Sequence, residues 1–169
     1  MDILELLTTR RSIRKYTDKE VSEEIVDSLL RAGMYAPSAG NQQPWHFMII
    51  RDKSTFERIN KFHPYSKMLL EANVAILVCA DTSIETHKGY WPVDCSAATE
   101  NILIAAHGLG LGAVWLGIYP RQERIDGIRK LFHLPDTIFP LSLISIGYPA
   151  EQKQKPERFI AARIHYEKW

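Results

Sequence analysis

Val74-Ala75-Ile76-Leu77-Val78-Cys79-Ala80 is the stretch around which we expect the fold to be built. It is a continuous apolar run of the length of a β-strand. A strand with one wet face would alternate apolar and polar residues, so this run predicts a strand that is buried on both faces.

Similar patterns predict further elements on either side of this run. Ser22 is the expected N-cap of the first long helix, with Glu23 and Glu24 in its first turn, and Ser54 is the expected cap of the second. We expect helices over about 21–35, 54–62, 92–107 and 121–132, and strands over about 45–51, 113–118 and 140–147.

The helix at 92–107 is rich in small residues and apolar on more than one side. Such a helix is buried, and we expect it to lie between the sheet and another copy of the chain. Gly108 and Gly110 end it.

Length and charge limit the classes of protein. With 169 residues and 46% hydrophobic content, the chain can fill one core, which we assign to a single domain over residues 1–148. The formal net charge of +1 argues against nucleic acid or an anionic membrane as the main partner.

The ends and the cysteines predict a compartment. The chain begins Met1-Asp2 and has no apolar stretch near the roughly 20 residues that span a bilayer, so we expect neither a signal peptide nor a membrane span. Cys79 and Cys95 lie in unlike contexts, and we expect free thiols in a reducing cytoplasm. No Cys/His pair has the spacing of metal ligands, so no metal site is expected.

Residues 149–169 cannot build a core element alone. Pro149 and Pro156 interrupt them, yet they finish on Tyr166 and Trp169. An apolar, aromatic terminus needs a surface on which to dock.

The segment Thr9-Arg10-Arg11-Ser12-Ile13-Arg14-Lys15-Tyr16 places three guanidinium groups close to one hydroxyl. Arginine suits a phosphate because its planar fork donates paired hydrogen bonds and stays charged. The alternative is an ordinary solvated basic loop.

A second segment favours the phosphate site over the solvated loop. It is Ala36-Pro37-Ser38-Ala39-Gly40-Asn41-Gln42-Gln43-Pro44-Trp45-His46-Phe47. Together with the arginine segment, the Gly108–Gly117 stretch and the basic arm that ends at Trp169, it resembles the FMN-dependent nitroreductase family over essentially the whole chain. The resemblance implies an α+β fold of three layers, α/β/α, with a mixed, mostly antiparallel central sheet. It also implies a homodimer with shared active sites, in which the C-terminal arm is swapped onto the partner subunit.

The resemblance also implies roles for the basic residues around FMN. Arg10 is the first choice for the phosphate, with Arg158 arriving from the arm and Lys155 as a weaker candidate beside it. Ser12 can donate to the phosphate or to the ring edge. Arg14 holds the family position near flavin N1. Arg11 follows Arg10 directly and should point the opposite way if the loop is extended, so it would contact the ribityl chain or solvent.

Two backbone features complete the implied site. The turn formed by Pro37, Ser38, Ala39, Gly40 and Asn41 reaches, in the family, the flavin bound mainly by the other subunit; the alternative is a plain helix-stopping loop. Leu116 and Gly117 end a predicted strand, and Gly117 aligns with the backbone N–H that contacts flavin N5. The alternative for Gly117 is that glycine simply forms the turn after the strand.

Trp45 and Phe47 alternate along their strand, and we expect both in the core.

The activity implied is ping-pong hydride transfer from NADH or NADPH, through the flavin, to a nitroaromatic, a quinone or a similar small electrophile. No side chain need act as nucleophile or general acid, because the cofactor performs the chemistry. Two alternatives are another FMN-dependent reductase, such as a dehalogenase, an enone reductase or a flavin-consuming enzyme, and a non-catalytic flavin-binding protein. A third is an α/β interaction module that binds no flavin.

The chain departs from the better-known members in being short. The segment around Tyr65-Ser66-Lys67-Met68 lacks an Asn found there in the family, and residues 82–92 are brief. The pocket is therefore expected either to be more open or to be covered by Tyr90 and Trp91. The preference between NADH and NADPH stays open.

Overall fold

The apolar run at 74–80 forms β2 (Val74–Asp81), which lies inside a four-stranded sheet. In the computed structural model, which describes residues 2–169, the strand order is β1 (Trp45–Ile50), β2, β4 (Ile138–Gly147), β3 (Gly112–Gly117), and all neighbours are antiparallel. Every residue of β2 from Val74 to Ala80 is buried, as the uninterrupted apolar run predicts.

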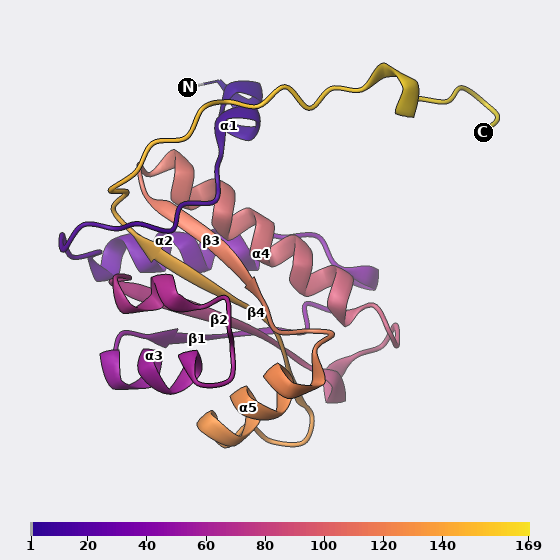
Figure 1. Cartoon of the computed structure of the whole chain (residues 1–169). Helices are drawn as coiled ribbons and strands as arrows, with labels where there is room; N and C mark the ends of the chain where they lie inside the picture. The colour runs from indigo at the N-terminus through magenta and orange to yellow at the C-terminus, as the bar shows by residue number, and fades with distance from the viewer. Residues whose placement is uncertain (1) are drawn as a thin grey trace.

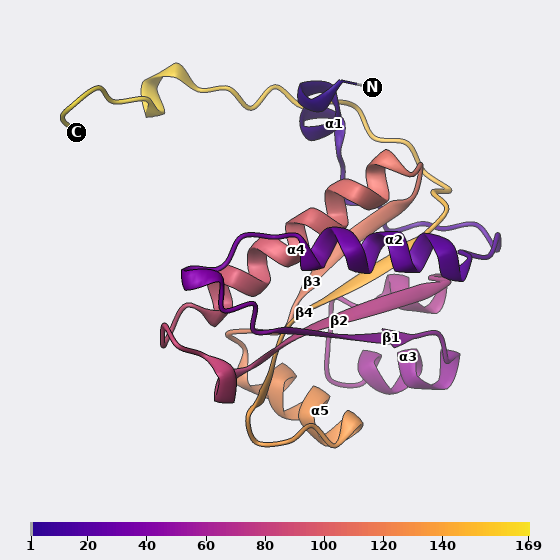
Figure 2. The ribbon, with the colours of Figure 1, turned by 180° about the vertical axis from the view of Figure 1, so that it is seen from behind.

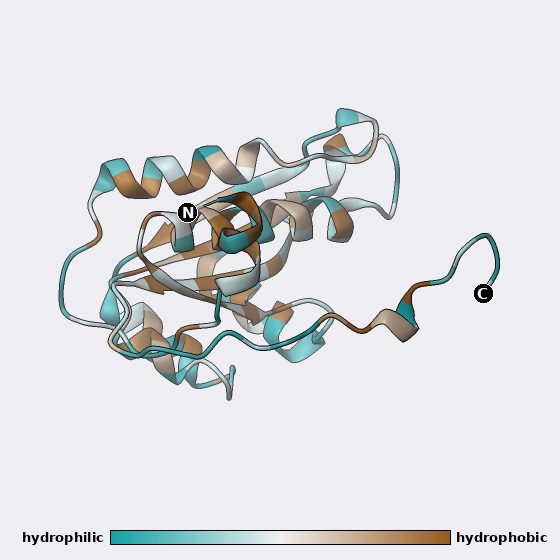
Figure 3. Ribbon diagram, turned by 90° about the horizontal axis from the view of Figure 1, so that it is seen from above, coloured by the Kyte–Doolittle hydropathy of each residue, from teal (hydrophilic) through white to brown (hydrophobic). Residues whose placement is uncertain are grey.

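Helices cover both faces of the sheet, which gives three layers (Figures 1 and 2). On one face, α2 (Glu23–Met34) and α4 (Trp91–Gly108) pack their apolar side chains on alternate residues of the strands. On the other, α3 (Lys53–Asn60) and α5 (Gln122–Phe132) do the same with the remaining alternate residues. Figure 3 shows the hydrophobic stripe of α2 turned toward the sheet and its polar residues turned away.

The expected α+β class is confirmed, and the sheet differs from the expected mixed one. Its four strands are wholly antiparallel, and the one parallel pairing within residues 2–169 is an isolated bridge between Ser12 and Ala113. This bridge lays the N-terminal segment along the outer edge of β3. A Cβ at Gly112 would lie 2.6 Å from Cγ2 of Ile13, so glycine allows this close crossing.

The expected elements are found with shifts of one to a few residues at their ends, and one of the two capping assignments is wrong. Asp52, not Ser54, caps α3, because its carboxylate accepts hydrogen bonds from the backbone N–H groups of Ser54 and Thr55. Ser22 does stand at the N-cap position of α2, but its side chain makes no capping hydrogen bond. A short helix that the sequence analysis did not predict, α1 (Ile3–Thr9), precedes the arginine segment.

The last twenty or so residues leave the body as an extended arm with one short 3₁₀ turn, Ala161–Arg163 (Figures 1 and 3). Aromatic and aliphatic side chains along it are exposed, among them Phe159, Tyr166 and Trp169. Within residues 2–169, no helix combines the length and the apolar character needed to cross a bilayer.

Candidate functional site

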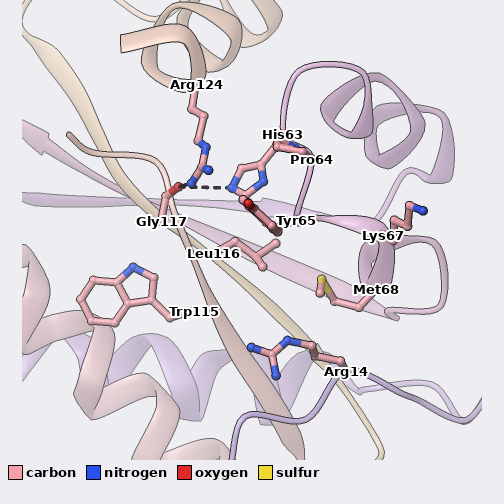
Figure 4. A pocket seen from close by; sticks show the side chains of 10 residues that line it. All are labelled: Arg14, His63, Pro64, Tyr65, Lys67, Met68, Trp115, Leu116, Gly117 and Arg124. Atoms are coloured by element: carbon pink, nitrogen blue, oxygen red, sulfur yellow. Dashed lines mark hydrogen bonds between the residues drawn. The ribbon is translucent and has the colours of Figure 1, made fainter. Parts of the chain in front are cut away.

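The main pocket of the chain, about 470 Å³, lies at the end of β3 (Figure 4). Four separate segments contribute to it: the N-terminal arginine segment, the connection between α3 and β2, the end of β3, and α5. Charged side chains lie at its rim and apolar ones in its middle. Its lining residues are Arg14, His63, Pro64, Tyr65, Lys67, Met68, Trp115, Leu116, Gly117 and Arg124.

Gly117 presents its backbone at the open edge of the sheet. The carbonyl of Ala113 accepts a hydrogen bond from the N–H of Ile13, which lies outside the sheet, at 3.0 Å. The N–H and C=O groups of successive residues point to alternate sides of a strand. Those of residues 115 and 117 therefore point, like those of Ala113, away from β4. A Cβ on Gly117 would approach nothing nearer than the Tyr119 carbonyl at 4.0 Å, so this backbone is open to a ligand.

Two side chains contact the carbonyl of Gly117. Nη1 of Arg124 donates to it at 2.7 Å, and Nε2 of His63 lies 3.2 Å from it (Figure 4). A carbonyl only accepts, so this contact assigns the ring proton of His63 to Nε2. Burial, with a further contribution from the positive charge of Arg124, lowers the pKa of His63, so the ring is neutral at neutral pH.

A smaller cationic pocket, about 170 Å³, adjoins the main one and shares Arg14 with it. Among the residues that the structure describes, none of those lining it is acidic. It is lined by Arg10, Arg11, Ser12, Arg14, Lys153 and Arg158. The concentration of guanidinium and ammonium groups around so small a volume suits a phosphate or another compact anion.

The start of the C-terminal arm ties this pocket together. Nζ of Lys153 donates to the Ser12 carbonyl at 2.6 Å and forms an ion pair with Glu151 at 3.3 Å. Oε1 of Glu151 accepts the backbone N–H of Arg14 at 2.6 Å, and this bond holds the pKa of Glu151 below its usual value. The arginine segment and the arm therefore form one unit.

The two neighbouring arginines differ in their partners. Arg10 forms an ion pair with Glu100 of α4, Nε to Oε1 at 3.2 Å. Nε of Arg11 is buried and has no hydrogen-bond partner within residues 2–169. Both arginines line the cationic pocket, and Arg11 also lines a second opening, next to Ile13, that Arg10 does not reach, so the expectation that the two point in different directions stays a prediction.

The expected turn at 37–41 lines neither pocket of its own chain. Its N–H at Ala39 donates to buried Asp94 of α4 at 2.9 Å, and Ser38 Oγ accepts from the N–H of Gln43 at 3.0 Å. These bonds fix a turn in which Gly40 and Asn41 have positive φ. Pro37 and the rest of the turn are therefore not brought together with Arg14 and Gly117 inside one chain.

The fold bears on two questions about the site that the sequence left open. Arg158 lines the cationic pocket and Lys155 does not, while Lys153, which the sequence analysis missed, does. Trp91 packs edge-on against Tyr119 with ring centroids 5.0 Å apart, and neither it nor Tyr90 lines the main pocket. In this chain the main pocket is open rather than covered by these two residues.

The sequence analysis also missed His63 and Arg124. Neither belongs to a motif, and a lone histidine or a helical arginine carries no signal of its own. Trp45 and Phe47 are in the core as expected, on the α2/α4 side of the sheet.

Comparison with known proteins gives the family. The model of the Nitroreductase family matches residues 7–63 and 60–148, and the chain belongs to that family. A protein of Methanothermobacter thermautotrophicus, provisionally named NADH dehydrogenase/NAD(P)H nitroreductase, is 52% identical over 169 residues, which are 100% of this chain and 88% of that protein. The expectation of an oxidoreductase is confirmed.

Solved structures agree with the fold. A provisionally named NADH dehydrogenase/NAD(P)H nitroreductase of Parabacteroides distasonis superposes with a TM-score of 0.94 at 42% identity, covering 98% of each chain. A provisionally named nitroreductase of Desulfovibrio desulfuricans, solved in complex with FMN, gives a TM-score of 0.87 at 34% identity over 100% of this chain and 98% of the other.

Proposed function

We propose that this protein is an FMN-dependent oxidoreductase that takes electrons from NADH or NADPH and passes them to a nitroaromatic, a quinone or a similar small electrophile. The observation that carries the proposal is the position of Arg14. It belongs both to the cationic pocket and to the larger, mainly apolar one, so the two form a continuous site. A ligand with a phosphate at one end and a flat ring at the other matches this pair.

The residues present fit FMN on a further observation. The buried Nε of Arg11 has no partner within the described chain, and a buried charged donor without an acceptor is costly. A phosphate in the cationic pocket would supply that acceptor. Leu116, Met68 and Trp115 would border the ring in the larger pocket. When bound, FMN supplies the hydride chemistry.

Each of the chain's own groups then has a task. Arg10, Arg11, Lys153 and Arg158 hold the phosphate, and Ser12 adds a hydroxyl donor. The guanidinium of Arg14 places a fixed positive charge beside the ring, where it stabilises negative charge. The open N–H of Gly117 is a donor at the ring edge, and His63 and Arg124 restrain the same residue through its carbonyl.

We further propose a homodimer with shared sites, made of one domain at residues 1–148 and an arm at 149–169 that extends onto the partner. Three features support it. The arm carries exposed Phe159 and Trp169 away from the body, α1 exposes Ile3 and Leu4, and the 37–41 turn is held in place without reaching the pocket of its own chain.

The first experiment is an anaerobic absorbance spectrum of the purified protein with FMN, before and after NADH and then NADPH. We expect a bound flavin band that one or both nucleotides bleach. A bound band that neither bleaches would replace the proposed enzyme by a non-catalytic flavoprotein, and the absence of binding would refute the site.

A pair of variants tests the phosphate assignment. Arg11→Gln is expected to weaken FMN binding by roughly tenfold or more, since a buried charge-assisted hydrogen bond contributes about 1.5–3 kcal/mol. Arg58→Gln, an exposed arginine of α3, is the matched control and should leave affinity unchanged. Equal FMN affinity in both variants would remove Arg11 from the site.

Deletion of residues 149–169 tests the dimer. The truncated chain is expected to sediment as a monomer and to lose FMN, because Lys153 and Arg158 leave with the arm. A truncated dimer that retains FMN would contradict the proposed arm.

A further inference from the structure

A further opening, about 380 Å³, continues the main pocket beyond Gly117. The two share Pro64, Tyr65 and Arg124, so they form one cleft rather than separate sites. We call this extension the arginine groove. Its lining residues are Pro64, Tyr65, Arg121, Gln122, Glu123 and Arg124.

The two arginines of the groove have no acidic partner within residues 2–169, whereas another arginine of the same helix does. Arg129 forms an ion pair with Asp136 at 3.0 Å. Arg124 instead donates a hydrogen bond from Nη1 to the Gly117 carbonyl at 2.7 Å. Its other N–H groups are left for a ligand. Arg121, at the N-cap of α5, has backbone hydrogen bonds there, and its side chain has no hydrogen bond or ion pair within residues 2–169.

One acidic residue, Glu123, also lines the groove, so its side chains sum to a single net positive charge. The amide of Gln122 is engaged by Asp126 at 2.8 Å. The groove therefore offers an excess of cationic donors to a ligand, but only a modest one. This matches a carboxylate or a phosphate monoester rather than a polyanion.

Tyr65 adds a flat wall to the groove. The residue is 70% exposed, and the guanidinium of Arg124 lies 5.6 Å from the centre of its ring. Figure 4 shows Tyr65 and Arg124 on the side of the pocket away from Arg14. A planar substrate whose reacting part lies in the main pocket could extend past Gly117 along this wall.

We propose that the arginine groove selects substrates bearing an anionic group, with Arg121 and Arg124 as the residues that determine this specificity. The proposal rests on the proposed function, since it assigns the far end of the same site. The anionic group has two sources of the same chemistry: the phosphate of the nicotinamide donor, or a carboxylate on the aromatic acceptor.

The test compares charged and neutral substrates of matched shape on the FMN-loaded protein. For the acceptor, the pair is 4-nitrobenzoate and 4-nitrobenzamide. For the donor, the pair is reduced nicotinamide mononucleotide and reduced nicotinamide riboside, which differ only in the phosphate. The quantity measured is the ratio of kcat/KM for the anionic member to that for the neutral member.

Arg121→Gln is expected to lower this ratio about fivefold in at least one pair, a size appropriate to a partly exposed charge pair. Glu123→Gln should raise the ratio in the same pair, because it removes the opposing charge. Lys130→Gln, an exposed lysine at the other end of α5, is the control and should leave both ratios unchanged. The pair that responds identifies the source of the anion.

Equilibrium titration of the oxidised, FMN-loaded protein with 4-nitrobenzoate and 4-nitrobenzamide gives a readout without turnover. The proposal would be overturned if Arg121→Gln left the kcat/KM ratio unchanged in both substrate pairs. It would also be overturned if Lys130→Gln changed the ratio as much as Arg121→Gln does. Such a result would leave FMN binding and bleaching by the donor intact. Failure of the proposed function would instead abolish those two signals in the unaltered protein.

Discussion

Glu151 is the residue whose removal tests most directly whether the arm and the arginine segment form one unit. Its carboxylate accepts the N–H of Arg14 at 2.6 Å and pairs with Lys153 at 3.3 Å, and its side chain is 21% exposed. A hydrogen bond to a charged group contributes about 1.5–3 kcal/mol, and an exposed ion pair adds about 0–1 kcal/mol. After allowance for the partial exposure, we expect Glu151→Ala to cost about 2 kcal/mol.

Thermal unfolding followed by circular dichroism measures this cost. For a domain of this size each kcal/mol lowers Tm by about 2–4 °C, so Glu151→Ala should unfold about 4–8 °C lower at pH 7. Glu151→Gln keeps an oxygen acceptor for the Arg14 N–H but loses the charge, and we expect about half of that decrease. Glu20→Gln, at an exposed position, is the matched control and should leave Tm unchanged.

The pH dependence supplies the decisive part of this experiment. The Arg14 N–H holds the pKa of Glu151 below its ordinary value, so the folded protein favours the carboxylate over the acid. The stabilisation is therefore complete above the ordinary pKa of about 4.3 and is lost as the pH falls through the lowered value. The Tm gap between the unaltered protein and Glu151→Gln should close toward pH 3. A gap of equal size at pH 3 and pH 7 would refute this reasoning.

Three further outcomes are expected. Gly112→Ala should destabilise the fold by about 1–3 kcal/mol, because the new Cβ would lie 2.6 Å from Cγ2 of Ile13; an unchanged urea midpoint would contradict the close crossing. Burial raises the pKa of Cys79 to about 12 and raises that of Cys95 as well, so neither thiol should react with a thiol reagent at pH 8 until the protein is unfolded. Arg14→Leu should retain FMN but lower its midpoint potential, and an unchanged potential would mean that Arg14 does not lie beside the ring.

Local signals were enough to predict most of the elements. The apolar run at 74–80 is a buried strand, and the helices at 23–34 and 91–108 lie close to their expected bounds. Capping was predicted less well. Ser54 and Asp52 are both good caps by residue type, and only the position of the first helical turn decides that Asp52 accepts the free N–H groups.

The candidate site likewise has residues that the sequence predicts and residues that it does not. The sequence alone determined the arginine segment and the strand end at Leu116 and Gly117, because these are contiguous residues whose chemistry is visible in their order. It could not determine that Lys153 rather than Lys155 joins the cationic pocket, because that depends on the path of the arm after Pro149.

Only the tertiary structure decided that His63 and Arg124 meet at the carbonyl of Gly117. These residues are far apart in the chain, and no periodicity or motif links them. They meet because α3 and α5 cover the same face of the sheet beside the open end of β3. The sequence therefore determined which groups the protein has and which local structures they form, while the packing of helices on the sheet determined which of those groups share a pocket.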